Sequence, residues 1–205
     1  MSTPVMAATA WPTNADMIAD CANLGYLRSS DRICDPTWGL GRWWTKWQPA
    51  EGNLHGSDID PAKSPTGTSI DFRRLHYADA TYDAVTFDPP YKLNGTPTAT
   101  TDARYGVHVI ATRAGRMQLI LDGITECARV VRAGGYVLAK AQDQVNGGKV
   151  RWQTIEIANH ARGIELELVD MLHMLGHRPQ PAGRSQQHAR RNLSTLLILQ
   201  KTGAA

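Results

Sequence analysis

The stretch YDAVTFDPPY, residues 82–91, decides the fold and shows where its chemistry lies. Residues 82–87 form a short, mainly apolar run that is typical of a buried strand. Pro89 and Pro90 cannot continue a central strand, because proline has no amide hydrogen for the ladder. Each proline also restricts the residue before it to extended geometry, so the strand ends at Asp88. We expect one carboxylate and the carbonyls after it to be held rigidly at this strand end.

These residue types suit chemistry on the amino group of a planar base. Such a nitrogen is a poor nucleophile because its lone pair is delocalised into the ring. Hydrogen bonds to the Asp88 carboxylate and the Pro89 carbonyl would favour a pyramidal nitrogen and aim its lone pair at an electrophile. The ring of Tyr91 could stack on the base, which contributes ~1–3 kcal/mol. In the simpler alternative, the prolines only end a strand and Asp88 caps the turn.

Strand and helix patterns alternate around this stretch. The expected strands cover 32–35, 54–61, 69–76, 82–87, 136–140, 164–175 and 193–199, and the expected helices cover 14–27, 114–132 and 150–162, with Asn14 as the first N-cap and glycines 134–135 as the end of the second helix. The alternation predicts an α/β fold with a mainly parallel sheet and helices on both faces. Ligands bind such sheets at the carboxyl ends of the strands.

Acidic residues lie at those expected ends. The turn DPTWGLG, residues 35–41, contains small residues that let the backbone approach a ligand closely, and it matches neither GxGxxG nor a P-loop. Asp58 follows the second strand, where an acid typically accepts hydrogen bonds from ribose hydroxyls. Asp79, just before Ala80, could accept one from an adenine amino group.

Composition and charge limit the functional classes. The 205 residues fit one domain, and 42% hydrophobic with 20% charged residues exclude a disordered chain, a collagen-like fibre and a coiled coil. Residues 1–100 carry a net charge of −3 and residues 101–205 one of +6. The second part is therefore the candidate surface for a polyanion, with an ordinary solvated basic surface as the alternative.

Three cysteines without a CxxC pair support neither a disulfide framework nor a zinc ribbon. His173 and His177 have no third ligand nearby, so we expect no metal. With no leader pattern and no apolar run of membrane-spanning length, we expect a cytoplasmic protein without a membrane partner. The tryptophans at 38, 43, 44 and 47 suggest either a stacking patch for nucleic acid or, as we favour, core packing.

Taken together, these motifs resemble class I S-adenosylmethionine-dependent methyltransferases, specifically the DPPY-carrying amino methyltransferases that modify N6 of adenine in DNA. The resemblance implies a Rossmann-like, mostly parallel seven-stranded sheet with an antiparallel last strand, and S-adenosyl-L-methionine as cofactor. It implies catalysis by Asp88, Pro89, Pro90 and Tyr91 on a base flipped out of the helix. The implied cofactor contacts are Thr13, Asp35, Pro36, Thr37, Gly39, Gly41, Asp58, Asp60, Asp79 and Ala80.

The strings DPPYKLNGTP and RPQPAGRSQQHARRN further resemble small actinobacterial and actinophage DNA methylases. Many members of the wider family carry a separate recognition domain, whereas here we expect residues 1–205 to form a single methyltransferase domain without one. Loops 92–116 and 177–192, a protein partner or a second copy would then supply target recognition. The candidate nucleic-acid contacts are Lys92, Arg104, Arg178, Arg184, Arg190 and Arg191.

Two other functions remain open on the sequence. The same motif occurs in enzymes that methylate N4 of cytosine in DNA or a base in rRNA. A noncatalytic DNA-binding or partner subunit with this fold is the third reading, and the retained acids at 35, 58, 79 and 88 count against it.

Overall fold

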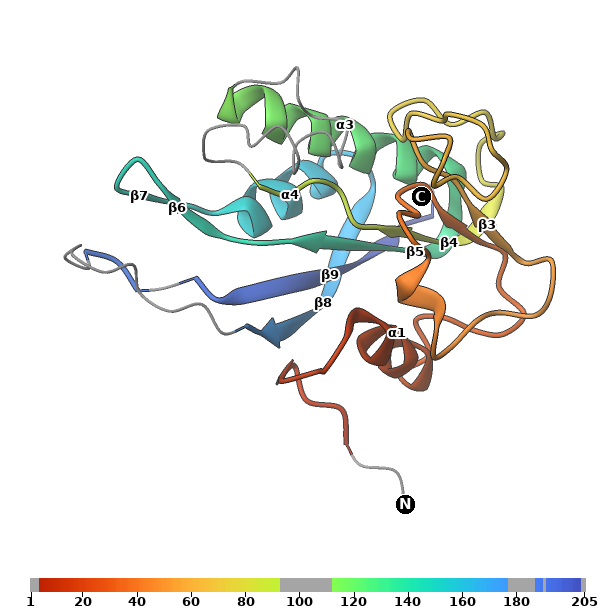
Figure 1. Ribbon diagram of the computed structural model, residues 1–205, viewed down its shortest axis with the longest axis horizontal. Helices are drawn as coiled ribbons and strands as arrows, with labels where there is room; N and C mark the ends of the chain where they lie inside the picture. The colour runs from red at the N-terminus through yellow and green to blue at the C-terminus, as the bar shows by residue number, and fades with distance from the viewer. Residues whose placement is uncertain (1–3, 93–111, 177–186, 190, 204–205) are drawn as a thin grey trace.

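The computed structural model describes residues 4–92, 112–176, 187–189 and 191–203. Its centre is a seven-stranded sheet of order β1-β8-β9-β5-β4-β2-β3 (Figure 1). Every neighbouring pair is parallel except the two that β9 makes with β5 and β8. The strands are β1 (Ala8–Thr9), β2 (Ile33–Asp35), β3 (Leu54–Gly56), β4 (Tyr82–Phe87), β5 (Val131–Ala141), β8 (Leu166–Leu175) and β9 (Leu193–Lys201). The predicted seven-stranded, mostly parallel sheet with an antiparallel last strand is confirmed.

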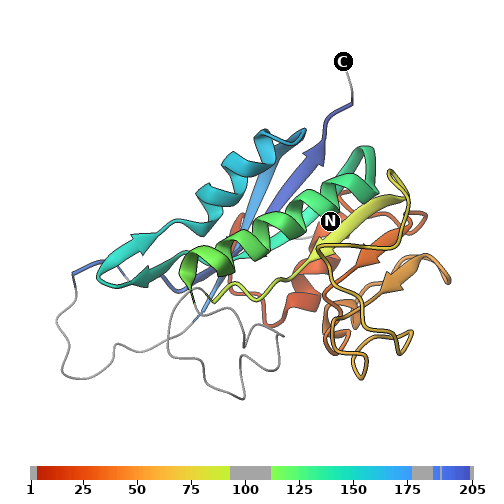
Figure 2. The same cartoon turned by 90° about the horizontal axis from the view of Figure 1, so that it is seen from above.

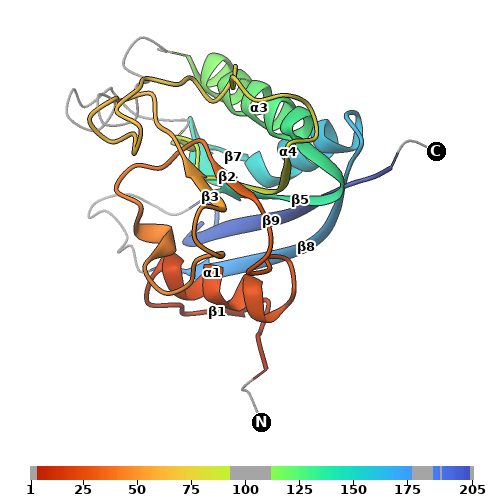
Figure 3. The ribbon, with the colours of Figure 1, turned by 90° about the vertical axis from the view of Figure 1, so that its right-hand side faces the viewer.

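Helices cover both faces of the sheet, as Figure 3 shows. They are α1 (Asn14–Asn23) and the short 3-10 helix η1 (Arg42–Trp44) on one face, and α3 (Arg113–Val130) and α4 (Gln153–Arg162) on the other. Alternation along β5 supplies both cores, since Leu138 packs on the first face and Ala139 on the second. Trp43 and Trp44 are buried in the first core, which confirms the packing interpretation for both.

The strand expected at 69–76 does not form. Ser69 makes only an isolated bridge with Asp58, and the chain then turns. Side chains take the place of ladder partners here, since the Asp71 carboxylate accepts from the Arg73 amide (2.9 Å) and Glu126 from the Leu75 amide (2.7 Å). The seventh strand is instead β1, which pairs with β8 at the far edge.

Other predicted ends were also wrong: the helix expected over 14–27 ends at Asn23, and the strand expected over 54–61 ends at Gly56. Thr13, not Asn14, caps α1, because its hydroxyl and the Asp16 carboxylate form a reciprocal capping box. Helix α3 ends at Val130, and the glycines expected to stop it lie within β5. A Cβ on Gly135 would lie 2.4 Å from the Asp83 carbonyl oxygen, so only glycine lets β5 approach β4 there. No helix in the described ranges is long and apolar enough to cross a membrane.

A separate antiparallel hairpin joins β5 to α4. It consists of β6 (Gln144–Asn146) and β7 (Lys149–Arg151). Gly147 and Gly148 both have positive φ, +58° and +70°, which is the backbone of a tight two-residue hairpin turn. We expected a helix from residue 150, but β7 occupies its first two positions and α4 begins at Gln153.

Candidate active site

A cavity of about 540 Å³ lies at the carboxyl ends of β2, β3 and β4. This volume is within the range of small-molecule sites, and the position is the one expected for a ligand of a parallel sheet. Six of the predicted catalytic and cofactor-binding residues line it together: Pro36, Thr37, Gly39, Asp58, Asp88 and Pro90.

The Asp35 carboxylate stabilises the glycine turn, residues 35–41, by accepting hydrogen bonds within it and from η1. It accepts hydrogen bonds from the Thr37 amide (3.1 Å) and the Trp44 indole (2.8 Å), and burial raises its pKa to about 7. The Thr37 hydroxyl in turn accepts from the Asp88 amide (2.9 Å), so the ends of β2 and β4 are tied together. Asp35 itself does not line the cavity, and its role in the structure is to shape the turn.

Asp58 connects this turn to β3. One of its carboxylate oxygens accepts from the Gly39 amide (2.8 Å) and the other from the Asp60 amide (2.9 Å). Gly39 has φ +57°, a left-handed conformation that favours glycine. Gly41 is needed for a different reason, because a Cβ there would lie 2.7 Å from the Trp38 ring. Trp38 therefore closes over Gly41, which does not line the cavity.

Asp88 is the most unusual group of the site. Its Oδ1 is buried and has no hydrogen-bond partner among the described residues. Burial raises the pKa of Asp88 to about 6, while the charge of Lys140 and a hydrogen bond from the Trp43 side chain act in the opposite direction. A buried acceptor without a partner is unfavourable in a folded protein and is common where a substrate completes the contact.

Lys140 ends the strand expected at 136–140, where the sequence favours a solvated strand terminus over a position near the active site. The structure shows that the solvated interpretation is wrong. Lys140 is only 1% exposed, donates to the Asn14 side chain, and has its Nζ 5.8 Å from the centre of the Trp43 ring. Burial lowers the pKa of Lys140, and the nearby Asp88 carboxylate partly opposes that shift. The buried Lys140 amine is thus close enough to the Asp88 carboxylate for their charges to interact, and no local sequence pattern predicts that Lys140 is buried.

The rest of the DPPY loop is firmly held. Pro89 and Pro90 are buried, and the Tyr91 carbonyl accepts from the side chains of Gln144 (2.5 Å) and Gln153 (3.1 Å). The Tyr91 ring packs, partly buried, against the core on the α3 face and does not line the cavity.

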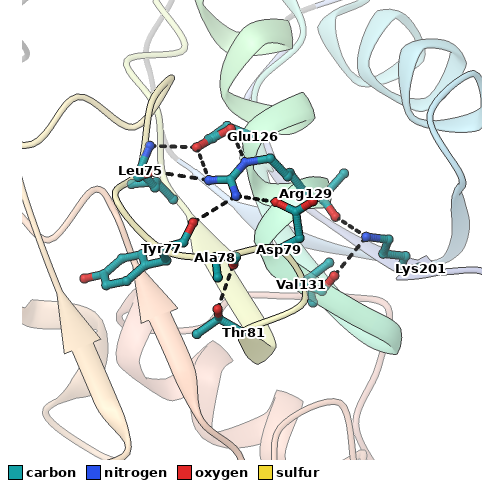
Figure 4. A network of polar contacts seen from close by, with 10 residues as sticks. Leu75, Tyr77, Ala78, Asp79, Thr81, Glu126, Arg129, Val131 and Lys201 are labelled. Carbon is teal, nitrogen blue, oxygen red and sulfur yellow. Dashed lines mark hydrogen bonds and ion pairs between the residues drawn. The ribbon is translucent and has the colours of Figure 1, made fainter.

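The structure does not bring Asp79 and Ala80 to this site. Asp79 lies before the start of β4, where its carboxylate pairs with Arg129 (2.6 Å) in the network of Figure 4. Asp88 is at the other end of the six-residue strand, about 20 Å away at 3.3 Å per residue. Ala80 donates its amide hydrogen to the Arg129 carbonyl (3.0 Å) at the same amino end. The prediction assumed a strand reaching residue 76.

Phe72 is the residue that this assumption missed. The isolated bridge is at Ser69, and Phe72, three residues further on, lines the cavity together with Asp58. The neighbouring Asp71 carboxylate is paired with Arg73 (2.6 Å). A prediction that ended the third strand near Ile70 would have placed Phe72 after the strand end, where cavity residues are expected.

Two other predicted cofactor contacts, Thr13 and Asp60, do not line the cavity. Thr13 is exposed and serves as the α1 cap, whereas its neighbour Asn14 lines the cavity. Asp60 is paired with Lys63 (3.1 Å). Within the described part of the chain, no group of three histidine, cysteine, aspartate or glutamate side chains could hold a metal ion.

Few of the proposed nucleic-acid contacts can be placed. Arg104, Arg178, Arg184 and Arg190 lie outside the described residues. The Lys92 carbonyl accepts from Arg116 (3.1 Å), and Arg116 is itself buried. Arg191 lies over the ring of Trp152, 4.4 Å from its centre.

No protein-family model and no curated protein matches the sequence. Solved structures match its fold. A candidate methyltransferase of Bacillus halodurans superposes with a TM-score of 0.58 at 10% identity, over 92% of this chain and 100% of that one. A Haloferax volcanii candidate methyltransferase, solved with the Trm112 activator, gives 0.57 at 12%, over 95% and 96%. A Methanosarcina mazei SAM-dependent methyltransferase gives 0.54 at 12%, over 88% and 97%.

A longer protein also matches in part. It is a candidate DNA modification methylase of Thermus thermophilus solved with S-adenosyl-L-methionine, with a TM-score of 0.46 at 16% identity over 66% of this chain. The chain spans about half the length of that methylase. At these identities the likeness concerns the fold, and the chain has the Rossmann-like fold of class I methyltransferases.

Proposed function

We propose that this protein transfers a methyl group from S-adenosyl-L-methionine to the exocyclic amino group of a base in DNA, with N6 of adenine as the target. The observation that supports this most directly is the Asp88 carboxylate. It lines the cavity at a strand end, and its Oδ1 has no partner among the described residues. An amino group is the kind of donor that completes such an acceptor.

The cavity suits the proposed cofactor. Gly39 and Thr37 would contact its amino-acid part, Asp58 its ribose hydroxyls and Phe72 its adenine ring, since these four residues line one cavity. When bound, the cofactor supplies a methyl group on a positively charged sulfur.

The chain's own contribution is to orient and deprotonate the amine. The Asp88 carboxylate and the Pro89 carbonyl accept the two N–H groups and direct the nitrogen lone pair at the methyl carbon. The N–C bond forms as the S–C bond breaks, and one amino proton leaves. With a pKa of about 6, Asp88 is mostly ionised at neutral pH and can hold that proton at its carboxylate.

Nucleic acid as substrate is supported by charge. The net charge of +6 on residues 101–205 and the Arg191–Trp152 stack suit a polyanion with aromatic bases. No acidic residue follows Asp170. Double-stranded DNA is the form that a flipped-base mechanism requires.

Methyl-labelled cofactor incubated with unmodified DNA, followed by nucleoside mass spectrometry, tests the proposal. We expect N6-methyladenine. N4-methylcytosine would change the base, and label found only in RNA would overturn DNA as substrate. DNA binding without any transfer would favour the noncatalytic reading.

Asp88→Ala and Asp79→Asn form a matched pair in the same assay. The first should abolish transfer while cofactor binding is largely retained. The second should leave transfer unchanged, because Asp79 lies at the amino end of β4 and pairs with Arg129. Full activity of Asp88→Ala would remove this carboxylate from the mechanism.

A further inference from the structure

The β6–β7 hairpin extends beyond the carboxyl edge of the sheet, away from β2 and β3 (Figure 2). Its register pairs Gln144 with Arg151 and Asn146 with Lys149. Because side chains alternate along a strand and paired residues share a face, these four residues lie on one face of the ribbon. That face consists of two amides and two cations.

The cations of the hairpin are not neutralised by neighbouring acids. Residues 144–153 contain no aspartate or glutamate. Among the residues that the structure describes, neither Lys149 nor Arg151 has a carboxylate within 4.0 Å, whereas seven other ion pairs are present. Lys149 is exposed, and the Nε of Arg151 is buried without a hydrogen-bond partner in that part of the chain. This face therefore suits an external polyanion.

A second segment extends the same surface. His188 makes a hydrogen bond with the Gly148 carbonyl in the hairpin turn (2.7 Å). Arg191 stacks on Trp152, which is 41% exposed directly after β7, and the Nε of Arg191 also has no partner among the described residues. An exposed tryptophan with an arginine on its ring is a typical element of nucleic-acid surfaces.

The base of the hairpin is fixed to the catalytic loop. Gln144 begins β6 and Gln153 begins α4 just after β7, and both side chains donate to the Tyr91 carbonyl. Gln153 also accepts from the Gln142 amide (2.9 Å), and Asp143 accepts from the Thr154 amide (3.0 Å). A ligand bound along the ribbon would thus lie in a defined position relative to residues 88–91.

We infer that the β6–β7 hairpin is a DNA-binding ribbon, which contacts the duplex beside the target base through Asn146, Lys149 and Arg151. This inference rests on the proposed function. A two-stranded ribbon fits the major groove, which is about 12 Å wide. Lysine and arginine bind phosphates or guanine, and asparagine can bind adenine, so the hairpin offers both backbone and base contacts.

The double variant Lys149→Ala/Arg151→Ala tests the inference. The control is Arg28→Ala/Arg162→Ala, which removes the same charge from exposed positions, before β2 and at the end of α4. Binding of a fluorescent DNA duplex is followed by anisotropy at several salt concentrations. We expect the hairpin variant to bind about tenfold or more weakly, with the slope of log K against log salt reduced by about two, and the control to match the parent.

The readouts separate the two proposals. The hairpin variant should raise KM for DNA more than it lowers kcat, with unchanged affinity for S-adenosyl-L-methionine. If the parent binds and methylates DNA but the hairpin variant binds equally well, or the control loses as much affinity, the hairpin inference is wrong and the proposed function stands. If the parent protein neither binds nor methylates DNA, the proposed function and the hairpin inference are both wrong. If the hairpin variant loses affinity for an RNA duplex but not for DNA, the DNA-binding role of the hairpin is wrong and RNA is its ligand.

Discussion

Asp88→Asn should stabilise the fold while it removes the activity. The pKa of Asp88 is about 6, against an ordinary value of 3.8, because its carboxylate is buried. A difference of about 2 units corresponds to ~3 kcal/mol against the ionised form, at 1.36 kcal/mol per unit. Lys140 loses its counter-charge in the variant, so we expect a net gain of about 1–2 kcal/mol in the free energy of unfolding at pH 8.

The sign of the effect depends on pH in a defined way. Below the unfolded-state pKa of Asp88 both states are protonated and the burial penalty vanishes. As the pH rises through about 6 the folded state must ionise this carboxyl, and the penalty becomes complete above that value. The stability difference between variant and parent should therefore be small near pH 4 and largest at pH 7–8. Burial and, in smaller part, the Asp88 charge raise the pKa of Asp35 to about 7, so this pKa should fall in the variant and add to the gain in stability at pH 8.

Urea unfolding at pH 4.5 and pH 8 measures this difference. The control is Asp83→Asn on the same strand. Burial alone would raise the pKa of Asp83, but the Arg32 amide and the Arg132 side chain outweigh it and lower the pKa, so this change should destabilise at pH 8. The reasoning on Asp88 is refuted if its variant is less stable than the parent at pH 8, or if the gain is the same at both pH values. Methyl transfer should fall ~10²-fold or more.

Three further predictions follow from the site. Phe72→Ala should weaken binding of S-adenosyl-L-methionine, measured by calorimetry, because Phe72 lines the cavity. Unchanged affinity would mean that the adenine ring binds elsewhere. Gly41→Ala should lower the free energy of unfolding by about 2 kcal/mol more than Gly52→Ala, measured by chemical unfolding. Both glycines have positive φ, but only a Cβ at Gly41 would meet the Trp38 ring, so equal losses would refute this contact. The transfer rate should fall as the pH drops below about 6, where Asp88 becomes protonated, and Lys140→Met should move this limb to higher pH. A limb that stays in place would mean that the Lys140 charge does not act on Asp88.

Local signals predicted those parts of the fold in which one segment determines its own structure. The strand at 82–87 matches β4, because a run of apolar residues followed by two prolines has one reasonable end. The end of α3 was wrong because Gly134 and Gly135 are common helix terminators, whereas here close contact with β4 requires glycine inside β5.

Some site residues could be predicted from local sequence, and others depended on contacts between distant segments. The cavity brings together Thr37, Gly39, Asp58 and Asp88, which each follow a strand of the parallel part of the sheet. Asp79 was misplaced because its assignment depended on a strand at 69–76. In place of that strand's ladder, the Arg73 and Leu75 amides donate hydrogen bonds to the carboxylates of Asp71 and Glu126. Gly147 and Gly148 between two short strand patterns are typical of a hairpin. This hairpin was missed because the helix pattern was extended back to residue 150, into β7.

By itself, the sequence determined which residues follow the ends of β2, β3 and β4, because proline geometry and the order of strand and turn are properties of neighbouring residues. Only the tertiary structure decided which edge of the sheet each acid occupies, that Lys140 is buried within reach of the Asp88 charge, and that Gln144 and Gln153 bind the Tyr91 carbonyl. The physical reason is that burial and hydrogen bonding join residues distant in the chain. Tyr91 and Gln153 are 62 positions apart, and no local pattern encodes their meeting.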